Sequence, residues 1–234
     1  MPGFKNMLRK LLPVVRHITF SLAIIAFCFC PSRMEVRALG KTVSPVTVSP
    51  GRSAEGWVCD VVPELERTRG QIPLSFLLGW IAVESGGDLK QVTKFNERGY
   101  FQLNPEESTE LGLQHVRLSS DAQYSIDAGP QVVLLYEQKA KMAGFVDTNT
   151  DLFWRMVKFY HSMGTGAVTR FLADVKAHGK FINSWTDVEA YAAAEQNRLI
   201  KKLHHDPVKW TENVDKVFRK AQHFQSLASG TCGT

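Results

Sequence analysis

The chain has 234 residues, of which 44% are hydrophobic and 22% charged, a composition typical of a globular protein with a buried core. The formal net charge is +5, but six of the 28 basic residues and only one of the 23 acidic residues lie within residues 1–38. The remaining residues carry 22 charges of each sign, which argues against a nucleic-acid-binding function of the folded part.

Residues 1–38 have the organisation of an export signal. A basic start is followed by an apolar run at residues 18–30 and by Val36-Arg37-Ala38, which has the small-residue form of a signal-peptidase site. The apolar run has 13 residues, whereas a membrane-spanning helix needs about 20. We interpret this segment as a cleaved signal, with an uncleaved N-terminal membrane anchor as the alternative. Both interpretations place the folded part in the periplasm or the extracellular cell envelope.

The cysteines are few. Cleavage after Ala38 removes Cys28 and Cys30 and leaves Cys59 and Cys232, one near each end of the mature chain. Outside the cytoplasm these two can form one disulfide that closes a long loop, and two unrelated thiols are the alternative. The sequence has no CxxC motif and no clustered histidines, so we predict neither a metal site nor a cofactor.

Residues 39–56 are rich in Ser, Pro, Thr and Val and predict a flexible linker, so the folded domain is expected at residues 57–234. Helical patterns then follow one another with no alternating strand pattern between them. We predict that the helix at residues 121–143 is bent or broken near Gly129-Pro130, and that Ser184 and Asp187 form a capping box. The fold class is all-α, with helices predicted at residues 60–68, 74–85, 121–143, 152–161, 166–177, 184–203 and from 206 onward.

Glu84 follows the most hydrophobic predicted helix, LSFLLGWIAV at residues 74–83. Apolar side chains occur on every side of this helix, so it is expected to be buried, and its last turn places Glu84 at the negative end of the helix dipole. Burial and the dipole both favour the protonated acid. Such an acid can protonate a leaving oxygen, which makes Glu84 a candidate general acid. A glutamate that simply emerges into water is the alternative.

Two later segments carry a resemblance to an enzyme family. Glu84-Ser85 is followed by GYFQLNP at residues 99–105 and by HSMGTGAV at residues 161–168. This combination resembles the signature of the soluble lytic transglycosylases, in which a catalytic Glu-Ser pair precedes a G-hydrophobic-hydrophobic-Q-hydrophobic-x-P segment and a later Tyr-Asn-Ala-Gly-x-Gly motif. The resemblance spans about residues 61–191.

The resemblance implies a lysozyme-like helical fold that cleaves peptidoglycan between N-acetylmuramic acid and N-acetylglucosamine. In that family one glutamate protonates the glycosidic oxygen and then helps the muramoyl 6-hydroxyl attack the anomeric carbon, which leaves a 1,6-anhydro end. The substrate's N-acetyl group stabilises the positive charge, so a second carboxylate is not needed. We therefore expect the acids near this segment to face solvent, namely Asp88, Glu97, Glu106 and Glu107.

The resemblance also assigns roles around the Glu-Ser pair. Ser85 is expected to orient Glu84, and the Gln102 amide is expected to reach into the glycan cleft, where it can donate and accept hydrogen bonds. Phe101 and Leu103 are expected to pack the loop against the domain.

The third motif departs from the family pattern. The family's Tyr falls on His161 and its Asn on Ser162, whereas a shift by one residue gives the aromatic role to Tyr160, for which core packing is the alternative. Both glycines of the motif remain in place. Tyr100 is a further candidate substrate contact, and Tyr191 either corresponds to a late family Tyr near the catalytic acid or faces the core.

Three functions follow from these patterns. The first is a peptidoglycan lytic transglycosylase, and the second is a goose-type lysozyme-like hydrolase in which a second acid holds a water molecule. The third is a cell-wall-binding protein without turnover, which the altered third motif favours and the retained Glu84 disfavours. Glycan strands of peptidoglycan are the expected partner in all three cases, and membrane contact is expected only through the N-terminal segment if it stays uncleaved.

Overall fold

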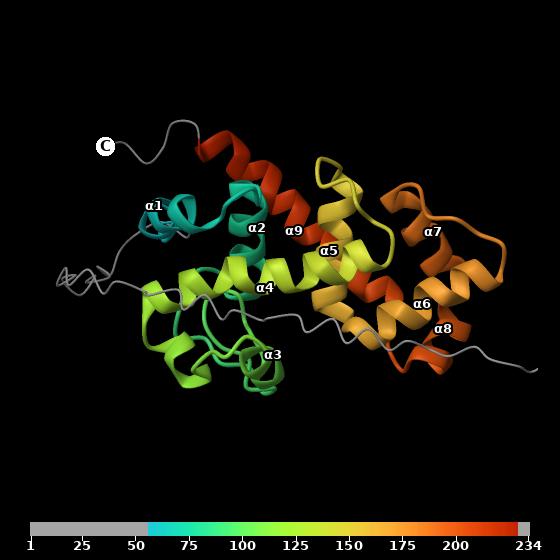
Figure 1. Ribbon diagram of the computed structural model, residues 1–234, viewed down its shortest axis with the longest axis horizontal. Coiled ribbons are helices and arrows are strands. Elements are labelled where there is room, and N and C mark those ends of the chain that lie inside the picture. Colours follow the sequence, from blue (N-terminus) through green and yellow to red (C-terminus); the bar gives the residue numbers. More distant parts are fainter. Residues whose placement is uncertain (1–55, 229–234) are drawn as a thin grey trace, which may run out of the picture. The chain divides into compact units, whose positions relative to one another are not determined.

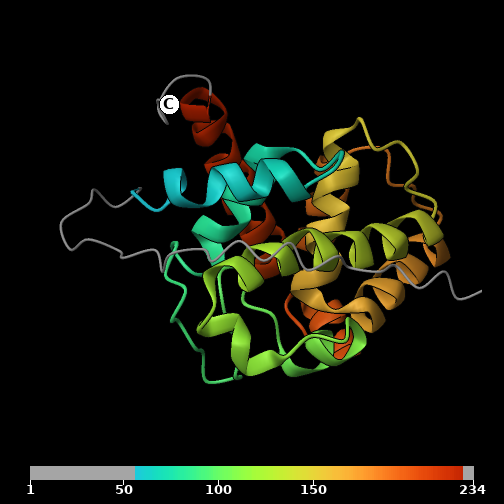
Figure 2. The same cartoon turned by 60° about the vertical axis from the view of Figure 1, so that its left-hand side comes forward.

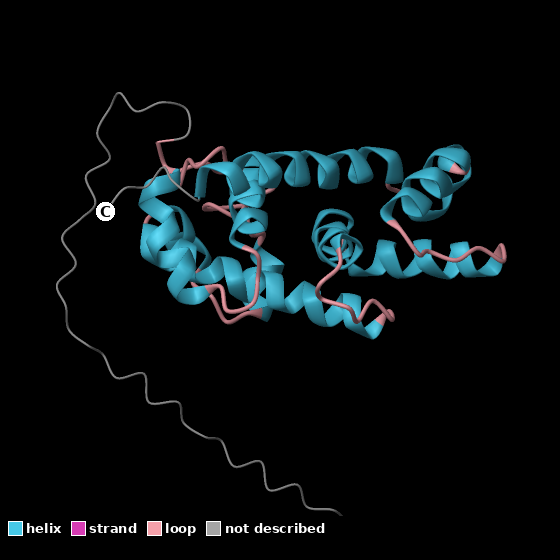
Figure 3. Ribbon diagram, turned by 90° about the horizontal axis from the view of Figure 1, so that it is seen from above, coloured by secondary structure: helices cyan, strands magenta, loops and turns pink. Residues whose placement is uncertain are grey.

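The computed structural model describes residues 56–228, in which helices are joined by loops and no strand occurs (Figure 1; Figure 3). The all-α prediction is therefore confirmed for this part of the chain. The predicted export signal, nearly all of the predicted linker and Cys232 lie outside the described residues. The helices are α1 Val58–Thr68, α2 Leu74–Glu84, α3 Pro105–Glu110, the 3-10 helix η1 His115–Ser119, α4 Ala122–Met142, α5 Asp151–Met163, α6 Thr165–Ala177, α7 Trp185–Ala194, α8 Gln196–Leu203 and α9 Pro207–Ala228.

The central helix is α2, as its composition predicts. Pro73 precedes its first turn, and every residue from Phe76 to Ile81 is buried. Its most extensive contact is with α9, and the two helices lie side by side in Figures 1 and 2. The C-terminal helix is thus a packing element, which buries Val214, Val217, Ala221 and Phe224. It also contacts α5 and α7.

Gly79 explains how α2 and α9 approach so closely. A Cβ atom at this position would lie 2.4 Å from the Val217 carbonyl oxygen and 2.8 Å from the Ala221 backbone nitrogen. Both neighbours are backbone atoms of α9, so they cannot move aside as a side chain can. Glycine inside this helix is therefore a requirement of the packing.

Gly79→Ala is expected to lower the free energy of unfolding by about 1–3 kcal/mol, because α9 must shift to accept the added methyl group. Gly166→Ala is the matched control, since the nearest atom to its added Cβ is 3.5 Å away on Arg170. That variant should be unchanged or more stable by about 0.5 kcal/mol. Urea unfolding of both variants measures the difference, and equal stability of the two would contradict the packing argument.

The long helix α4 is unbroken at Gly129-Pro130. The helix continues through both residues, so of the two predicted alternatives, a bend or a break, the break is absent. Gly129 is needed for packing instead, because a Cβ there would lie 2.1 Å from the ring of Phe101. Both residues are buried, and burial of this face of α4 stabilises the helix despite the hydrogen bond that proline cannot form.

Three other features of the structure also differ from the prediction or extend it. The helix predicted at residues 184–203 consists of α7 and α8, separated at Glu195, although its capping box at Ser184 and Asp187 is confirmed. The short helices α3 and η1 were not predicted. Cys59, in α1, is disulfide-bonded, and the other three cysteines lie outside the described residues. The pairing of Cys59 with Cys232 stays a prediction.

Within residues 56–228 no helix is long and apolar enough to cross a membrane.

Candidate functional site

Glu84 is the last residue of α2, so a buried helix carries it to the edge of the core. Its side chain is 19% exposed. The Glu84 backbone carbonyl accepts a hydrogen bond of 3.1 Å from the Gln91 side-chain amide, which connects the end of α2 to the following loop. The end of α2 is therefore held in place, and the Glu84 side chain still reaches solvent.

The partner of Glu84 is a buried lysine on α5. Lys158 Nζ lies 2.5 Å from Glu84 Oε1, and the lysine side chain has no exposed surface. The ammonium group also lies 4.4 Å from the centre of the Trp80 ring, within the range of a cation–π interaction. Glu84 Oε2 has no hydrogen-bond partner among residues 56–225. Lys158 thus pairs with one oxygen of the carboxylate and leaves the other without a protein partner in this part of the chain.

This contact changes the expected electrostatics of Glu84. The sequence predicted a carboxylic acid that keeps its proton because burial and the helix dipole disfavour an anion. The structure places the buried Lys158 ammonium group 2.5 Å from this carboxyl group, a charged neighbour that the prediction did not include.

A hydrogen-bonded chain continues from Lys158 into the core. Lys158 Nζ donates to His161 Nδ1 at 2.8 Å, and His161 Nε2 lies 3.5 Å from Glu107 Oε1. The Tyr136 hydroxyl donates to the same Glu107 oxygen at 2.6 Å. Four helices meet in this group because α2, α3, α4 and α5 each contribute at least one member. We call Glu84, Lys158, His161, Glu107 and Tyr136 the acid–lysine network.

Burial and charge shift the ionisation of two members of this network. Burial, and secondarily the neighbouring Lys158 ammonium, hold the pKa of His161 well below its ordinary value. Burial raises the pKa of Glu107, and the hydrogen bonds from Tyr136 and from the Asn104 backbone act in the opposite direction. His161 is consequently neutral and can accept a hydrogen bond from Lys158.

The neutral state of His161 predicts a pH dependence of stability. An unfolded histidine binds a proton below pH about 6.5, whereas the folded His161 does not, so its contribution is fully present above that pH and is lost as the pH falls below it. Between pH 7.5 and 5.5 the wild type should therefore lose about 1.4 kcal/mol more than His161→Gln. Urea unfolding at both pH values measures this difference.

The exposed His205 provides the control for that comparison. His205→Gln should lose as much stability as the wild type over the same pH interval. If His161→Gln and His205→Gln behave alike, His161 is not held neutral in the folded protein.

Ser85 fastens the end of α2 to the segment at residues 99–105. Its hydroxyl is buried and donates to the Tyr100 carbonyl at 2.9 Å. The Tyr100 backbone nitrogen in turn donates to Ser125 Oγ at 3.0 Å, which attaches the segment to α4. Ser85 thereby positions the backbone beside Glu84. Phe101 and Leu103 are fully buried, so their predicted packing role is confirmed.

Gln102 and Tyr100 turn towards the protein interior. Gln102 is 2% exposed, and its amide nitrogen donates to the carbonyls of Gly99 and Gln91 at 2.7 and 3.1 Å. Its Oε1 atom is buried and has no partner among the described residues, as is true of Trp80 Nε1. Tyr100 is 7% exposed, and burial raises the pKa of its hydroxyl. The structure thus gives Gln102 a loop-bracing role and does not place it in an open cleft.

The two candidate aromatic residues of the third motif, Tyr160 and His161, lie in different parts of the structure. His161 belongs to the acid–lysine network, whereas Tyr160 lines a separate groove. Of these two residues, His161 is the one that is connected to Glu84, and the connection runs through Lys158. Gly164 adopts φ = 81° between α5 and α6, a conformation that favours glycine.

Tyr191 belongs to a different cluster. Its hydroxyl donates to Asp174 Oδ2 at 2.6 Å, and the pKa of Tyr191 is raised to about 12 by burial and by this carboxylate. Asp174 is buried and also accepts hydrogen bonds from Arg198 and Lys202. The ion pairs connect α6 to α8, and the Tyr191 hydrogen bond adds α7. Tyr191 therefore takes the core-facing position that was the alternative to a place near Glu84.

The expectation that four nearby acids face solvent is wrong for one of them. Asp88 and Glu106 are exposed and Glu97 is half-buried, but Glu107 is only 5% exposed. Glu107 folds back because it closes a capping box with Asn104 at the start of α3.

Two cavities accompany these residues, and Glu84 lines neither. One has a volume of about 570 Å³ and is bounded by Val83 together with four cationic or titratable side chains of α9, Lys216, Arg219, Lys220 and His223. The other is the groove that contains Tyr160. Within residues 56–228 there is no cluster of three or more His, Cys, Asp or Glu residues that could hold a metal ion.

Comparison with known proteins gives no match: no protein-family model, no curated protein and no solved structure is similar to this chain at a significant level.

Proposed function

We propose that the chain is a peptidoglycan lytic transglycosylase with a lysozyme-like domain, in which Glu84 is the single acid and base. The observation that carries the proposal is the state of Glu84 at the end of a buried helix. One oxygen is fixed at 2.5 Å by a fully buried lysine, and the side chain is still 19% exposed. The order of the Glu-Ser, GYFQLNP and HSMGTGAV segments supports the same assignment.

In the proposed reaction Glu84 Oε2 gives a proton to the glycosidic oxygen as the bond from that oxygen to the anomeric carbon of N-acetylmuramic acid breaks. The substrate's acetamido group stabilises the positive charge at this carbon. Glu84 then accepts the proton of the muramoyl 6-hydroxyl while the oxygen of that hydroxyl bonds to the anomeric carbon. The products are a 1,6-anhydro end and a free hydroxyl on the leaving sugar, and Glu84 regains its proton.

Lys158 is a positioning residue in this scheme. Because its ammonium group fixes Oε1, Oε2 is the oxygen that exchanges protons with the substrate. Lys158 therefore acts on the reaction only by holding this carboxyl group in place.

The hydrolase is the second candidate, and Glu107 is the acid that the network offers for it. Both Glu107 oxygens already accept hydrogen bonds from the protein, Oε1 from Tyr136 and Oε2 from the Asn104 backbone. With an exposure of 5%, this carboxylate is poorly placed to hold an attacking water molecule. The geometry therefore favours the transglycosylase over the hydrolase.

Purified sacculi provide the test of enzyme against binding protein. The residues 57–234 protein is incubated with sacculi, and both co-sedimentation and release of soluble glycan fragments are followed. The proposal predicts co-sedimentation together with release. Co-sedimentation without release would instead identify a cell-wall-binding protein, and the absence of both would remove peptidoglycan as the ligand.

A further inference from the structure

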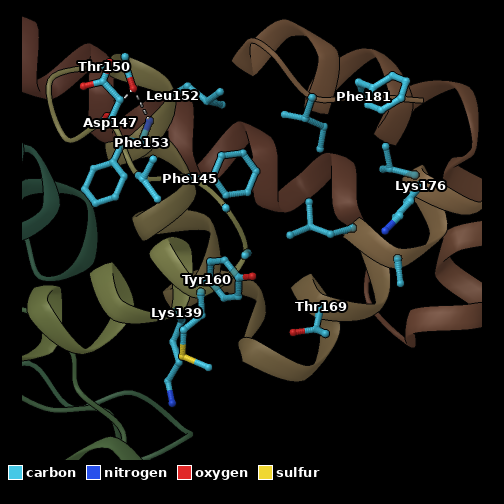
Figure 4. A pocket seen from close by; sticks show the side chains of 18 of the residues that line it. Lys139, Phe145, Asp147, Thr150, Leu152, Phe153, Tyr160, Thr169, Lys176 and Phe181 are labelled. Atoms are coloured by element: carbon cyan, nitrogen blue, oxygen red, sulfur yellow. Dashed lines mark hydrogen bonds between the residues drawn. The ribbon is translucent and has the colours of Figure 1, made fainter. Parts of the chain in front are cut away.

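A groove separate from the acid–lysine network runs between the end of α4, the start of α5 and one face of α6 (Figure 4). Its volume is about 780 Å³, within the range of small-molecule sites in proteins. The groove reaches core residues: Phe153, Tyr160 and Val175 line it and are 1%, 2% and 3% exposed. Neither Glu84 nor Lys158 lines it, so a binding role for this groove is independent of the proposed function.

Large apolar side chains at the groove are left open to solvent. Met142 is 85% exposed, Val146 69% and Phe181 80%, and all three line the groove. Single exposed apolar residues are common, but a group of them around an apolar cavity marks a binding surface. In Figure 4 Phe145 and Phe181 face the groove from opposite sides.

The charges along the groove are mostly positive. Lys139, Lys176 and Lys180 line it, against one acid, Asp147. Lys176 and Lys180 form no ion pair with any side chain of residues 56–225, and both are exposed. Asp147 already accepts a hydrogen bond of 3.0 Å from the Asn149 backbone, which reduces its capacity to neutralise the lysines. An anionic head group is the complement of this rim.

We propose that the groove binds an anionic amphiphile with a single long acyl chain, the chain lying on the apolar floor and the acidic head group beside Lys176 and Lys180. The volume suits one small ligand, and the charge selects its head group. The protein's own apolar run at residues 18–30 is a poorer occupant, because Arg16 and Arg33 flank it and like charges would face the lysines.

Isothermal titration calorimetry of the full 234-residue chain with hexadecanoate, below its micelle concentration, tests the proposal. We expect saturable binding. The affinity should fall about tenfold for each pair of methylene groups removed from the acyl chain, because each buried methylene contributes a nearly constant free energy. Hexadecyltrimethylammonium, which has the same chain and a positive head group, should bind at least about tenfold more weakly.

Two variants locate the site. Ala173 is exposed and lines the groove, so Ala173→Trp should fill it and remove hexadecanoate binding without disturbing the core. The double variant Lys176→Glu/Lys180→Glu should weaken binding about tenfold, whereas Lys90→Glu/Lys201→Glu, a charge reversal elsewhere on the surface, should not.

Four results would overturn the proposal, and each points to a different explanation. Equal affinity for the anionic and cationic amphiphiles would show that the rim does not select charge. Unchanged binding by Ala173→Trp would place the ligand elsewhere. Binding to phosphatidylglycerol vesicles without binding of monomeric hexadecanoate would identify a membrane contact. A dimer that Ala173→Trp dissociates, detected by light scattering in the absence of ligand, would identify a second copy as the occupant.

Discussion

Glu84→Gln is expected to reduce the release of soluble fragments from sacculi by at least about 1,000-fold, because general acid and base catalysis both depend on this carboxyl group. Glutamine preserves the shape of the side chain, and its amide oxygen can still accept the hydrogen bond from Lys158. It cannot exchange a proton with the glycosidic oxygen. Glycan binding, measured by co-sedimentation, should therefore remain largely intact.

Glu106→Gln is the matched control for this variant. Glu106 is exposed on α3, outside the acid–lysine network, so the same substitution there should leave the rate unchanged. Thermal unfolding verifies that both variants are folded. Fragment release by Glu84→Gln at the rate of the wild type would remove Glu84 from the mechanism.

Lys158→Met is expected to lower the rate of fragment release by about 10–100-fold, the loss that corresponds to one hydrogen bond to a charged group. Methionine has a similar length and suits the fully buried site, but it leaves Glu84 Oε1 without its donor. Co-sedimentation with sacculi should stay at the wild-type level, because the Lys158 side chain is fully buried and does not contact the glycan. A general disruption of the domain would weaken this binding as well.

Lys141→Met separates this effect from the general loss of a lysine. Lys141 pairs with Glu137 on the solvent side of α4 and is 44% exposed, so its ion pair should contribute little. The rate and the sacculus binding of this variant should match the wild type. A lower rate for Lys158→Met together with weaker co-sedimentation would limit Lys158 to a structural role.

The sequence predicts the all-α fold class and most of the helices of residues 56–228. The spacing of apolar residues and the signals at helix ends are local properties of the sequence. The buried α2 and the apolar face of α9 are examples. A break at Gly129-Pro130, one of the two predicted alternatives, does not occur, and the reason is tertiary. Gly129 packs against Phe101, and this contact is made by residues 28 positions apart, which local rules do not describe.

Lys158 is the largest omission in the predicted site. A lysine in a helix is normally assigned to the surface, and its contact with Glu84 joins residues 74 positions apart. One signal was available: Lys158 lies within MVKFY at residues 156–160, between apolar residues that belong to the buried face of α5. The expected neutral acid depended only on residues near Glu84 in the chain, so it missed this counter-ion.

Glu107 could have been found from the sequence, whereas Tyr136 could not. Asn104 and Glu107 have the spacing of a capping box, which folds the glutamate back over the start of a helix. That pattern predicts a Glu107 side chain held near the protein. Its contact with Tyr136 depends on how α3 lies against α4, and no motif in either helix specifies this.

Mass spectrometry of the fragments that the wild-type protein releases from sacculi shows whether the muramoyl 6-hydroxyl or water is the nucleophile, because the nucleophile determines the chain ends. If Glu84 activates the muramoyl 6-hydroxyl, the fragments carry 1,6-anhydro ends, which are lighter by one water molecule than reducing ends. Reducing ends would show that water is the nucleophile and would contradict the transglycosylase assignment.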